Sequence, residues 1–579
     1  VNINIDGASS TLVELDHATF YIGSVLVWRG PIRGISGQDS QVELRAVGGN
    51  CNFKKGRVIA RSRSSRSESN GVYVGSIDVV SQSNQHLEED VRLQLEKLLS
   101  RREKAFASHE NDLGLTHVDE MKINLTTDIP VHYRPYRLSF AERKWVQEKV
   151  KSLVEANVVR ESSSDYASPI ILVRKSNGQR RLCVDYRTLN AITVKDRYPM
   201  PLIQDLLDKL SGKTFFTKLD LAQGFHQVPL HPDSIHKSAF VTPDGHYEYL
   251  RVPFGLANSP AVFQRVMHKI LGELRHTDVL VYMDDLLIPS CTTDRGLELL
   301  DKVLKLIELS GVKLNLDKCS FLQSSVEYLG HEISADGVRP GQRKIEAVAH
   351  FPKPANVHSV RQFLGLCSYF RKFVKNFAII AKPLNELLHK NVSWSWGEQQ
   401  QTAFETLKEI LSKRPILALY SSSSEIEVHT DASKWGCAGI LLQKSNSGDW
   451  QPVEYYSRST TLTEQKYHSY ELETMAVVES IKRFRVYLLG IPFKVITDCV
   501  SVRATLAKKD LIPRIARWWL DIQEYDMSIE YRPGQRMNHV DALSRNPVVS
   551  QIRLIALSES DWFLTLQMQD PKVQGIVED

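Results

Sequence analysis

Two adjacent carboxylates, Asp284 and Asp285, stand between apolar runs in the segment LVYMDDLL. An apolar strand, a turn and a second apolar strand predict a hairpin whose tip carries both negative charges. Carboxylates this close repel and raise one another's pKa unless a cation neutralises them. The pair therefore suits a divalent metal ion. Aspartate is also a frequent turn residue, so the pair by itself fits either interpretation.

A third acid, Asp220, ends the apolar segment FFTKLD. A lone aspartate at the end of a strand is usually a helix cap or a turn residue. One acid together with an adjacent pair, each at a strand end, can hold two divalent ions about 4 Å apart for in-line phosphoryl transfer. The three acids therefore indicate phosphoryl-transfer chemistry if the fold brings them together.

Four more acids follow downstream: Asp431 in TDAS, Glu473 in ELETMAVV, Asp498 in ITDC and Asp541 in NHVDALSR. A strand end, a helix, a strand end and a late helix could bring them together as a second two-metal site. Each acid taken singly is more often a cap or a surface charge. On the expected helix Glu471 and Glu473 point about 200° apart, so only one of the two can face such a site.

Five ordered motifs resemble the signatures of reverse transcriptases. They are LCVDYRTLN at 182–190, FxxLDLxxGFHQ around Asp220, PFGLANSP at 253–260, YMDD at 282–285 and YLGH at 328–331. The sequence around them, YASPIILVRKSNGQRRLCVDYRTLN at 166–190 and RQFLGLCSYFRKFVKNFAIIAKPL at 361–384, most closely resembles Pol of gypsy-class LTR retrotransposons. The four downstream acids resemble those of the retroviral and retrotransposon ribonuclease H domain. The resemblance runs from about residue 106 to 547.

For the polymerase, the resemblance implies a catalytic triad of Asp220, Asp284 and Asp285 that binds two Mg²⁺ ions, with Mn²⁺ as an alternative and Leu221 as a further metal ligand. It also implies residues that bind the incoming dNTP, namely Lys175, Arg181, Phe225, Phe254 and Gly255, and residues that contact the primer, namely Tyr328, Leu329 and Gly330. Phe225 would exclude a 2′-hydroxyl, whereas without the family it would be interpreted as a core aromatic. Lys175 and Arg181 could also be solvated surface charges, which is the interpretation we favour for Lys218.

For the ribonuclease, the resemblance implies that Asp431, Glu473, Asp498 and Asp541 are catalytic and bind two metal ions. Glu473 is chosen because Ala476 completes the E-x-x-A pattern of the family, which leaves Glu471 facing solvent. Retroviral enzymes carry a loop histidine shortly before the last acid, and this sequence has Tyr531 ten residues before Asp541. Whether Tyr531 or His539 takes over the role of that histidine stays open.

The elements that must position these residues follow from periodicity. Strand-like and helical segments interleave up to about Pro340, and 344–419 is mainly helical and interrupted by prolines. The stretch AERKWVQEKVKSLVEANVV predicts a helix with one apolar face, listed as Trp145, Val146, Val150, Leu153 and Val154. EIEVHTDASKWGCAGILLQ predicts paired strands. The expected fold is a multidomain α/β (α+β) chain with a right-hand polymerase (fingers, palm, thumb), a connection region and a ribonuclease H-like α/β domain.

Length and composition agree with a soluble globular chain of several domains. The 579 residues suggest about four units at roughly 150 residues each. The net charge of +5 neither indicates nor excludes a nucleic-acid partner. Seven dispersed cysteines without a C-x-x-C pair indicate free thiols, and no apolar run is long enough to cross a membrane.

The expected organisation has five parts. Residues 1–85 are unassigned, with a faint protease-like turn at Asp6-Gly7 and a basic Ser/Arg-rich linker between 54 and 67. Fingers and palm cover 86–340, thumb and connection helices 341–420, and the ribonuclease H-like domain 425–547. Residues 548–579 resemble a connector toward an integrase.

The resemblance implies an RNA- and DNA-directed DNA polymerase that also degrades the RNA strand of a hybrid. Expected partners are the RNA template, DNA primer and product, RNA–DNA hybrid, dNTPs and other Gag-Pol products, without a membrane. Expected locations are the cytoplasm, within a virus-like particle, and the nucleus during integration. The alternative is a decayed or domesticated copy that binds nucleic acid without catalysis.

Overall fold

The computed structural model describes residues 87–109, 112–174, 178, 180–390, 392–505 and 511–533, together with short strands before residue 65. The chain divides into two units, Val1–Ser83 and Asn84–Asp579. In the first unit the described strands pair antiparallel: β1 (Asn2–Ile3) with β4 (Ser40–Gln41), β2 (Thr11–Leu15) with β6 (Ala60–Ser64), and β3 (Val25–Leu26) with β5 (Arg45–Ala46). β6 lies inside the Ser/Arg-rich run, so five residues of the expected linker form a strand.

A four-stranded antiparallel sheet occupies the centre of the polymerase-like part of the second unit. Its strand order is β13 (Leu280–Tyr282), β14 (Asp285–Ser290), β10 (Phe215–Asp220) and β15 (Ser320–Gln323). Two amphipathic helices, α7 (Ser259–Leu271) and α9 (Thr293–Leu309), contact this sheet. Thr292 caps α9 by accepting from the Arg295 backbone N–H, and α2 (Glu89–Arg101) packs on α9. The sheet thus has rigid support beneath the strand ends that carry the acids.

The strands of a second sheet come from before and after β10 in the chain. Their order is β7 (Val159–Glu161), β12 (Gly245–Tyr249), β11 (Phe240–Thr242), β8 (Ser168–Arg174) and β9 (Arg180–Val184). Short helices α4 (Arg187–Ile192), α5 (Ile203–Asp208) and α6 (Pro232–Ile235) accompany the two sheets. The expected helix is α3 (Phe140–Glu155), opened by a capping box of Ser139 and Glu142.

The apolar face predicted for α3 is partly wrong. Val146, Val150 and Leu153 are buried as expected, whereas Val154 is 40% exposed. At 100° per residue Val154 lies about 80° away from Val146, at the edge of the stripe rather than at its centre.

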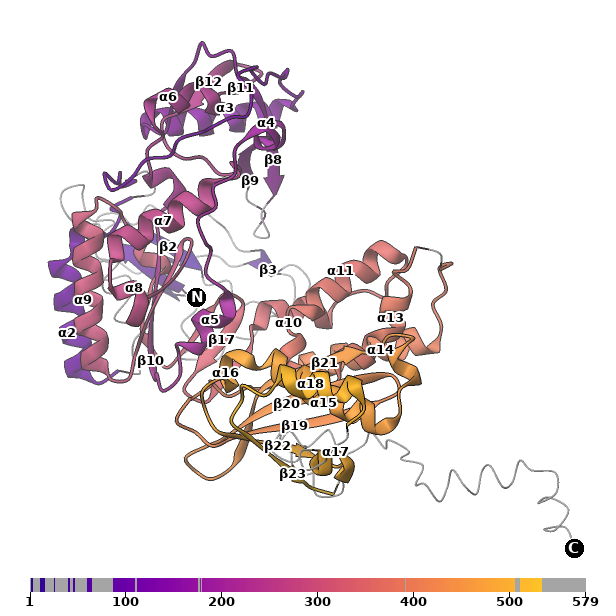
Figure 1. Cartoon of the computed structure of the whole chain (residues 1–579). Coiled ribbons are helices and arrows are strands. Elements are labelled where there is room, and N and C mark those ends of the chain that lie inside the picture. Colours follow the sequence, from indigo (N-terminus) through magenta and orange to yellow (C-terminus); the bar gives the residue numbers. More distant parts are fainter. Residues whose placement is uncertain are drawn as a thin grey trace, which may run out of the picture. The chain divides into compact units, whose positions relative to one another are not determined.

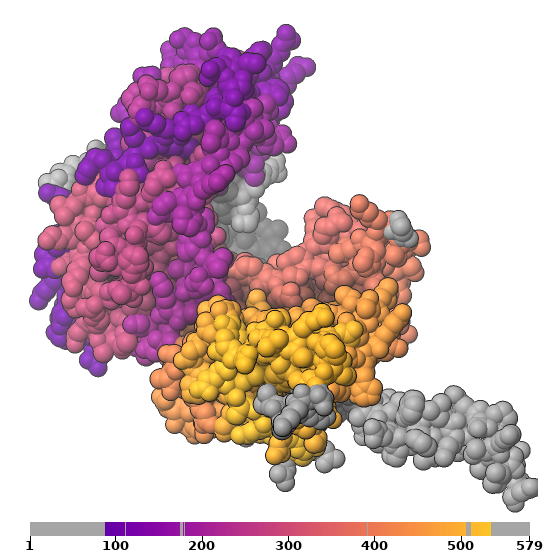
Figure 2. Space-filling view, in the orientation of Figure 1, coloured from indigo at the N-terminus to yellow at the C-terminus, as the bar shows by residue number. Residues whose placement is uncertain are grey.

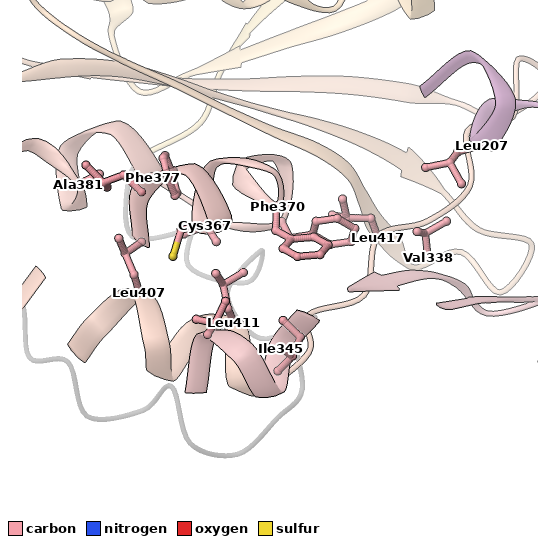
Figure 3. Close-up of a cluster of buried hydrophobic side chains, with 14 of the residues drawn as sticks. Leu207, Val338, Ile345, Cys367, Phe370, Phe377, Ala381, Leu407, Leu411 and Leu417 are labelled. Atoms are coloured by element: carbon pink, nitrogen blue, oxygen red, sulfur yellow. The ribbon is translucent and has the colours of Figure 1, made fainter. Parts of the chain in front are cut away.

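Residues 325–412 combine a hairpin sheet with helices. The sheet contains β16 (Ser325–Tyr328), β17 (His331–Ser334) and β18 (Gly337–Pro340), and the helices are α10 (Gln342–Ala349), α11 (Val357–Ser368), α12 (Phe377–Ile380), α13 (Lys382–Glu386) and α14 (Glu398–Ser412). Their buried side chains form one core, which Leu207 of α5 joins (Figure 3). Pro383 stands in the first turn of α13, directly after α12 ends, so it separates two short helices as predicted; a proline fits there because the first-turn N–H needs no partner within the helix.

The last described part is a five-stranded mixed sheet. Its order is β21 (Trp450–Ser459), β20 (Gly436–Lys444), β19 (Ile426–Ser433), β22 (Phe493–Thr497) and β23 (Met527–Tyr531), with β22 parallel to both neighbours. Helices α15 (Ser469–Arg483), α16 (Arg485–Leu488), α17 (Val500–Thr505) and α18 (Pro513–Asp521) accompany it. α15 packs on β19 and β20, with α18 beside it (Figure 1). Figure 2 shows the outer face of this part, coloured orange to yellow. The predicted strand pair is the β19–β20 hairpin.

None of the described helices combines the length and apolar character needed to cross a bilayer.

Candidate active sites

The first acidic cluster, defined as Asp220, Asp284 and Asp285, is assembled by antiparallel strand pairing. Asp220 is the last residue of β10 and stands directly opposite Asp285, the first residue of β14. Asp284 lies in the turn between β13 and β14, where Met283 takes the left-handed φ of 52°. Directly opposed residues have Cβ atoms about 5 Å apart, so side chains 65 positions apart in sequence meet at one sheet edge.

The electrostatics of this cluster favour a bound cation. Burial raises the pKa of Asp284 to about 6, and the negative charges of Asp220 and Asp285 add to the shift. Burial likewise raises the pKa of Asp220. Oδ1 of Asp284 is buried and has no hydrogen-bond partner among the described residues. A carboxylate oxygen held this way is costly unless a positive charge reaches it.

Two lysines contact the cluster. Lys218 Nζ lies 3.1 Å from Asp285 Oδ1, and Lys318 Nζ lies 3.3 Å from Asp220 Oδ1. The interpretation of Lys218 as a solvated surface charge is wrong, because its side chain is only 26% exposed and is ion-paired. Lys218 stands two residues before Asp220 on β10, and residues i and i+2 share a strand face. The lysines therefore lower the local negative charge.

A turn after β10 makes room for Asp284. A Cβ added to Gly224 would lie 2.6 Å from Asp284 Oδ1 and 2.9 Å from Phe263 Cζ. The next residue, Phe225, is 8% exposed and packs against Phe254 and Phe263, with ring centroids 5.0 and 5.3 Å apart. Phe225 is thus a largely buried aromatic side chain, and it directly follows the glycine whose added Cβ would meet Asp284.

Three of the residues expected to bind the nucleotide, Arg181, Phe225 and Phe254, are in contact. The Arg181 guanidinium stacks 4.3 Å from the centroid of the Phe254 ring, and Gly255 has a left-handed φ of 99°. Asn190, which sequence reasoning missed, holds this loop by donating to Gly255 O and accepting from Ala257 N–H, at 2.8 and 2.7 Å. Its position in the LCVDYRTLN motif was the available signal.

The expected primer contact is the turn between β16 and β17. Leu329 and Gly330 both have left-handed φ values, 49° and 76°, and the Tyr369 hydroxyl donates to Leu329 O at 2.6 Å. The Tyr328 side chain is fully buried in the core of 325–412. Tyr328 therefore supports the turn from beneath, and the backbone of Leu329 and Gly330 forms its surface.

The second acidic cluster, defined as Asp431, Glu473 and Asp498, joins β19, α15 and the residue after β22. β19 and β22 run parallel with His429 beside Ile496, so Asp431 within β19 and Asp498 just after β22 lie at the same end of the sheet. Burial raises the pKa of Glu473 to about 8, with Asp431 and Asp498 adding to it. Desolvation raises the pKa of Asp431 as well, although its side chain faces solvent. Glu473 Oε2 is buried without a partner in the described part of the chain.

The structure supports the choice of Glu473, but the prediction that Glu471 faces solvent is wrong. Glu471 accepts from the His468 backbone N–H in a capping box and pairs with Arg514 at 2.8 Å, and its side chain is only 14% exposed. It is therefore committed to the start of α15 instead of facing solvent. Tyr531 ends β23 and is 37% exposed. Lys175, His539 and Asp541, like the Asp6-Gly7 turn, lie outside the described residues.

Comparison with protein families decides the identity of these two parts. A family described as "Reverse transcriptase (RNA-dependent DNA polymerase)" matches residues 173–333, and one described as "RNase H-like domain found in reverse transcriptase" matches residues 396–495. The chain carries a reverse transcriptase domain followed by a ribonuclease H-like domain. The first match contains the first acidic cluster, and the second contains Asp431 and Glu473.

Relatives of this reverse transcriptase chain are Pol polyproteins of transposons. The retrovirus-related Pol polyprotein from transposon 297 of Drosophila melanogaster is 36% identical over 466 residues, 79% of this chain and 44% of that protein. The transposon Tf2-3 polyprotein of Schizosaccharomyces pombe is 36% identical over 433 residues, 74% of this chain and 32% of that protein. The chain thus spans less than half the length of these relatives.

Solved structures share the fold. The foamy viral protease-reverse transcriptase in complex with dsDNA gives a TM-score of 0.71 at 23% identity, covering 80% of this chain and 97% of that one. The same protein in complex with an RNA/DNA hybrid gives 0.66 at 22% identity, covering 82% and 64%. The expected fold class, a polymerase followed by a ribonuclease H-like α/β domain, is confirmed.

The donor set of the reverse transcriptase site fits a divalent metal that is shared with substrate. Among the described residues no three histidine, cysteine or acidic side chains enclose a position for an ion by themselves. Mg²⁺ typically takes one or two protein carboxylates and completes its shell with water and substrate phosphates. The unpartnered Oδ1 of Asp284 and Oε2 of Glu473 suit this mode of binding. Because a leucine side chain has no donor atom, Leu221 could contribute only its backbone carbonyl.

Proposed function

We propose that this chain copies RNA and DNA templates into DNA at the first acidic cluster and cleaves the RNA strand of RNA–DNA hybrid at the second. The observation that carries the proposal is the register that sets Asp220 opposite Asp285, with the buried carboxylate of Asp284 at the adjoining turn. We further propose that the element is of the gypsy class, because the sequence around the motifs most closely resembles Pol of gypsy-class LTR retrotransposons.

The chain's own residues would divide the work by position. Bound Mg²⁺, or Mn²⁺ in its place, would act as a Lewis acid on the primer 3′-hydroxyl and on the triphosphate. Asp220 and Asp284 would hold the ions, and Arg181 would contact the triphosphate, where negative charge accumulates. Phe225, braced by Phe254 and Phe263, would exclude a ribose 2′-hydroxyl.

At the second acidic cluster, Asp431, Glu473 and Asp498 would hold two ions against the RNA strand, with Asp541 as a fourth ligand. A primed template would be bound mainly through phosphates, so its affinity should fall as salt rises. The foamy viral structures named above contain dsDNA or RNA/DNA hybrid, which supports nucleic acid of these kinds as the substrate. The expected dNTP substrate, the Gag-Pol partners and the cellular locations stay predictions.

Primer extension on poly(rA)/oligo(dT) with Mg²⁺ tests the polymerase. Losing a metal-binding carboxylate removes several kcal/mol of transition-state stabilisation, so Asp284→Asn should extend at least about 100-fold more slowly. The same variant should still cleave hybrid RNA, and Asp431→Asn and Asp498→Asn should show the reverse pattern. A wild-type chain that binds duplex without extending it would establish the domesticated, non-catalytic alternative.

A further inference from the structure

The turn that carries Asp284 is held by a buried glutamine. Gln264 lies on α7 with no exposed surface, and its Oε1 accepts from the Met283 backbone N–H at 2.7 Å. Its Nε2 donates to Val281 O at 3.1 Å. Met283 has a left-handed φ of 52°, a conformation that a non-glycine residue keeps only when its surroundings impose it. The Gln264 amide supplies such surroundings from both sides of the turn.

The orientation of this amide is determined by its partners. A backbone N–H can only donate and a carbonyl can only accept, so Oε1 must face Met283 and Nε2 must face Val281. The second N–H of Nε2 is directed to His268 Nε2, 2.8 Å away and one turn further along α7. His268 must therefore accept at Nε2, which places the proton of its neutral ring on Nδ1.

That proton has a partner as well. His268 Nδ1 lies 2.7 Å from the Tyr198 hydroxyl, so His268 donates and Tyr198 accepts. The result is a continuous series of hydrogen bonds from Tyr198 through His268 and Gln264 to the turn that carries Asp284. The N–H groups of Gln264 and His268 are all matched to acceptors only while the His268 ring is neutral.

We propose that Tyr198 and His268 are positioning residues, acting through Gln264 on the Asp284 turn, and that DNA synthesis requires His268 to be neutral. The inference rests on the proposed polymerase function. When His268 binds a second proton, Nε2–H points at an N–H of Gln264. The amide must then turn or move away, and Met283 N–H loses its acceptor. The turn becomes free to leave its left-handed conformation, which displaces Asp284.

The surroundings of His268 favour the neutral ring. Burial lowers the pKa of His268, and positive charge on Arg275, His276 and Lys209 adds to this. Arg275 and His276 both lie in α8 (Leu274–Thr277), and Lys209 follows α5. On α7 itself, Arg265 is ion-paired with Asp196 at 2.6 Å and Asp119 at 3.3 Å, so its charge is largely compensated. These groups keep His268 neutral near pH 7. We therefore expect the turn to lose its hydrogen bond from Met283 only at acidic pH.

The test is single-turnover incorporation of one nucleotide at saturating dNTP and Mg²⁺ between pH 5 and 8. His268→Gln retains an acceptor toward Gln264 and a donor toward Tyr198 but does not titrate. Below the pKa of His268 the neutral fraction falls about tenfold per pH unit, so the wild-type rate should fall more steeply with acid than the rate of His268→Gln. Protonation of the catalytic carboxylates affects both proteins alike. His389→Gln, an exposed histidine outside α7, should follow the wild-type profile.

Two further variants keep the inference falsifiable. His268→Leu removes the acceptor and should lower the rate at every pH while leaving primer-template affinity unchanged. Tyr198→Phe removes only the hydroxyl and should lower the rate at pH 8. Cleavage of hybrid RNA by the same molecules reports whether each variant is folded. Superimposable pH profiles of wild type and His268→Gln, or a wild-type rate in Tyr198→Phe, would overturn the inference while leaving polymerase function intact. A wild type that fails to extend at pH 8 overturns the proposed function itself.

Discussion

Single carboxylates in both clusters are held in surroundings that oppose their charge. Glu473 and Asp284 are desolvated, lie beside other acids, and each has an oxygen without a partner among the described residues. Such groups weaken the folded state and become favourable only when a cation arrives, so both clusters store free energy for metal binding.

The raised pKa of Glu473 predicts a stability effect that depends on pH. Its folded-state pKa of about 8 exceeds the ordinary value of 4.5, so its contribution is present below about pH 4.5 and is lost as pH rises through 8. In EDTA, Glu473→Gln should therefore be more stable than wild type at pH 8.5, by on the order of 3 kcal/mol, and similar at pH 4.5. Thermal unfolding at the two pH values measures the difference in stability between Glu473→Gln and wild type. Adding Mg²⁺ should make that difference at pH 8.5 smaller. An equal pH dependence in both proteins would contradict it.

The same helix provides a matched comparison for RNA cleavage. Glu473→Gln should abolish cleavage of hybrid RNA, whereas Glu471→Gln should retain it, because Glu471 is bound to the start of α15 and to Arg514. A cleavage assay under identical Mg²⁺ conditions decides between them. If only Glu471→Gln were inactive, the choice of Glu473 would be wrong.

Phe225 supports a prediction about sugar selection. Phe225→Val shortens the aromatic side chain that we propose excludes a ribose 2′-hydroxyl, so incorporation of NTP relative to dNTP should rise by about tenfold or more. The comparison of kcat/KM for the two nucleotides measures it. Because Phe225 is packed against Phe254 and Phe263, the variant should also lose about 1–3 kcal/mol of stability. Unchanged nucleotide preference would leave Phe225 as a core aromatic only.

At the scale of elements, the reverse transcriptase site depends on how closely a turn approaches a hairpin. Gly224 opens the short 3-10 helix Gly224–Gln227 directly against Asp284. Gly224→Ala should push Asp284 aside and reduce DNA synthesis at least about tenfold while RNA cleavage continues. Gly365→Ala in α11 is the control, since its added Cβ meets nothing within 4 Å. A wild-type rate of DNA synthesis by Gly224→Ala would show that the β13–β14 hairpin can move to accept the added methyl group.

The elements also show what the sequence could predict. Local patterns were sufficient for the β19–β20 hairpin and for α3, because alternation and a capping box are contained within each segment. The pairing of Asp220 with Asp285 spans 65 positions, and only the family resemblance suggested it. Lys218 and Glu471 were misjudged because their partners come from other elements or from helix-end geometry. Gln264 gave no signal, since a glutamine on an apolar helix face has no pattern of its own.

At the scale of the whole second unit, polar side chains connect the polymerase-like part with the ribonuclease H-like part. The Tyr487 hydroxyl of α16 donates to Asp208 Oδ2 at 3.1 Å and accepts from Gln204 Nε2 at 2.9 Å, both on α5. Lys372 donates to Gln204 Oε1 at 2.6 Å. Burial raises the pKa of Asp208 to about 6 and lowers that of Lys372 to about 8. The contact is therefore partly buried and joins side chains that can carry charge.

Tyr487→Phe tests this contact. Loss of the hydroxyl removes two hydrogen bonds in a buried setting, which should cost about 1–3 kcal/mol. Calorimetry should show the unfolding transitions of the two parts moving further apart, because each would then unfold with less support from the other. Tyr136→Phe, at an exposed tyrosine, should leave the transitions unchanged. Coincident shifts of both transitions would argue against a specific connection.

The polar character of this contact has a consequence for how the molecule handles its substrate. When an apolar interface opens, it exposes surface that is unfavourably hydrated and that can associate with other chains. A contact made by tyrosine, glutamine, aspartate and lysine can open, because water hydrates the separated side chains. It can then re-form between the same partners. Under the proposed function both sites would act on one duplex, and a polar contact that can part and re-form would let the two parts shift relative to one another while they hold it.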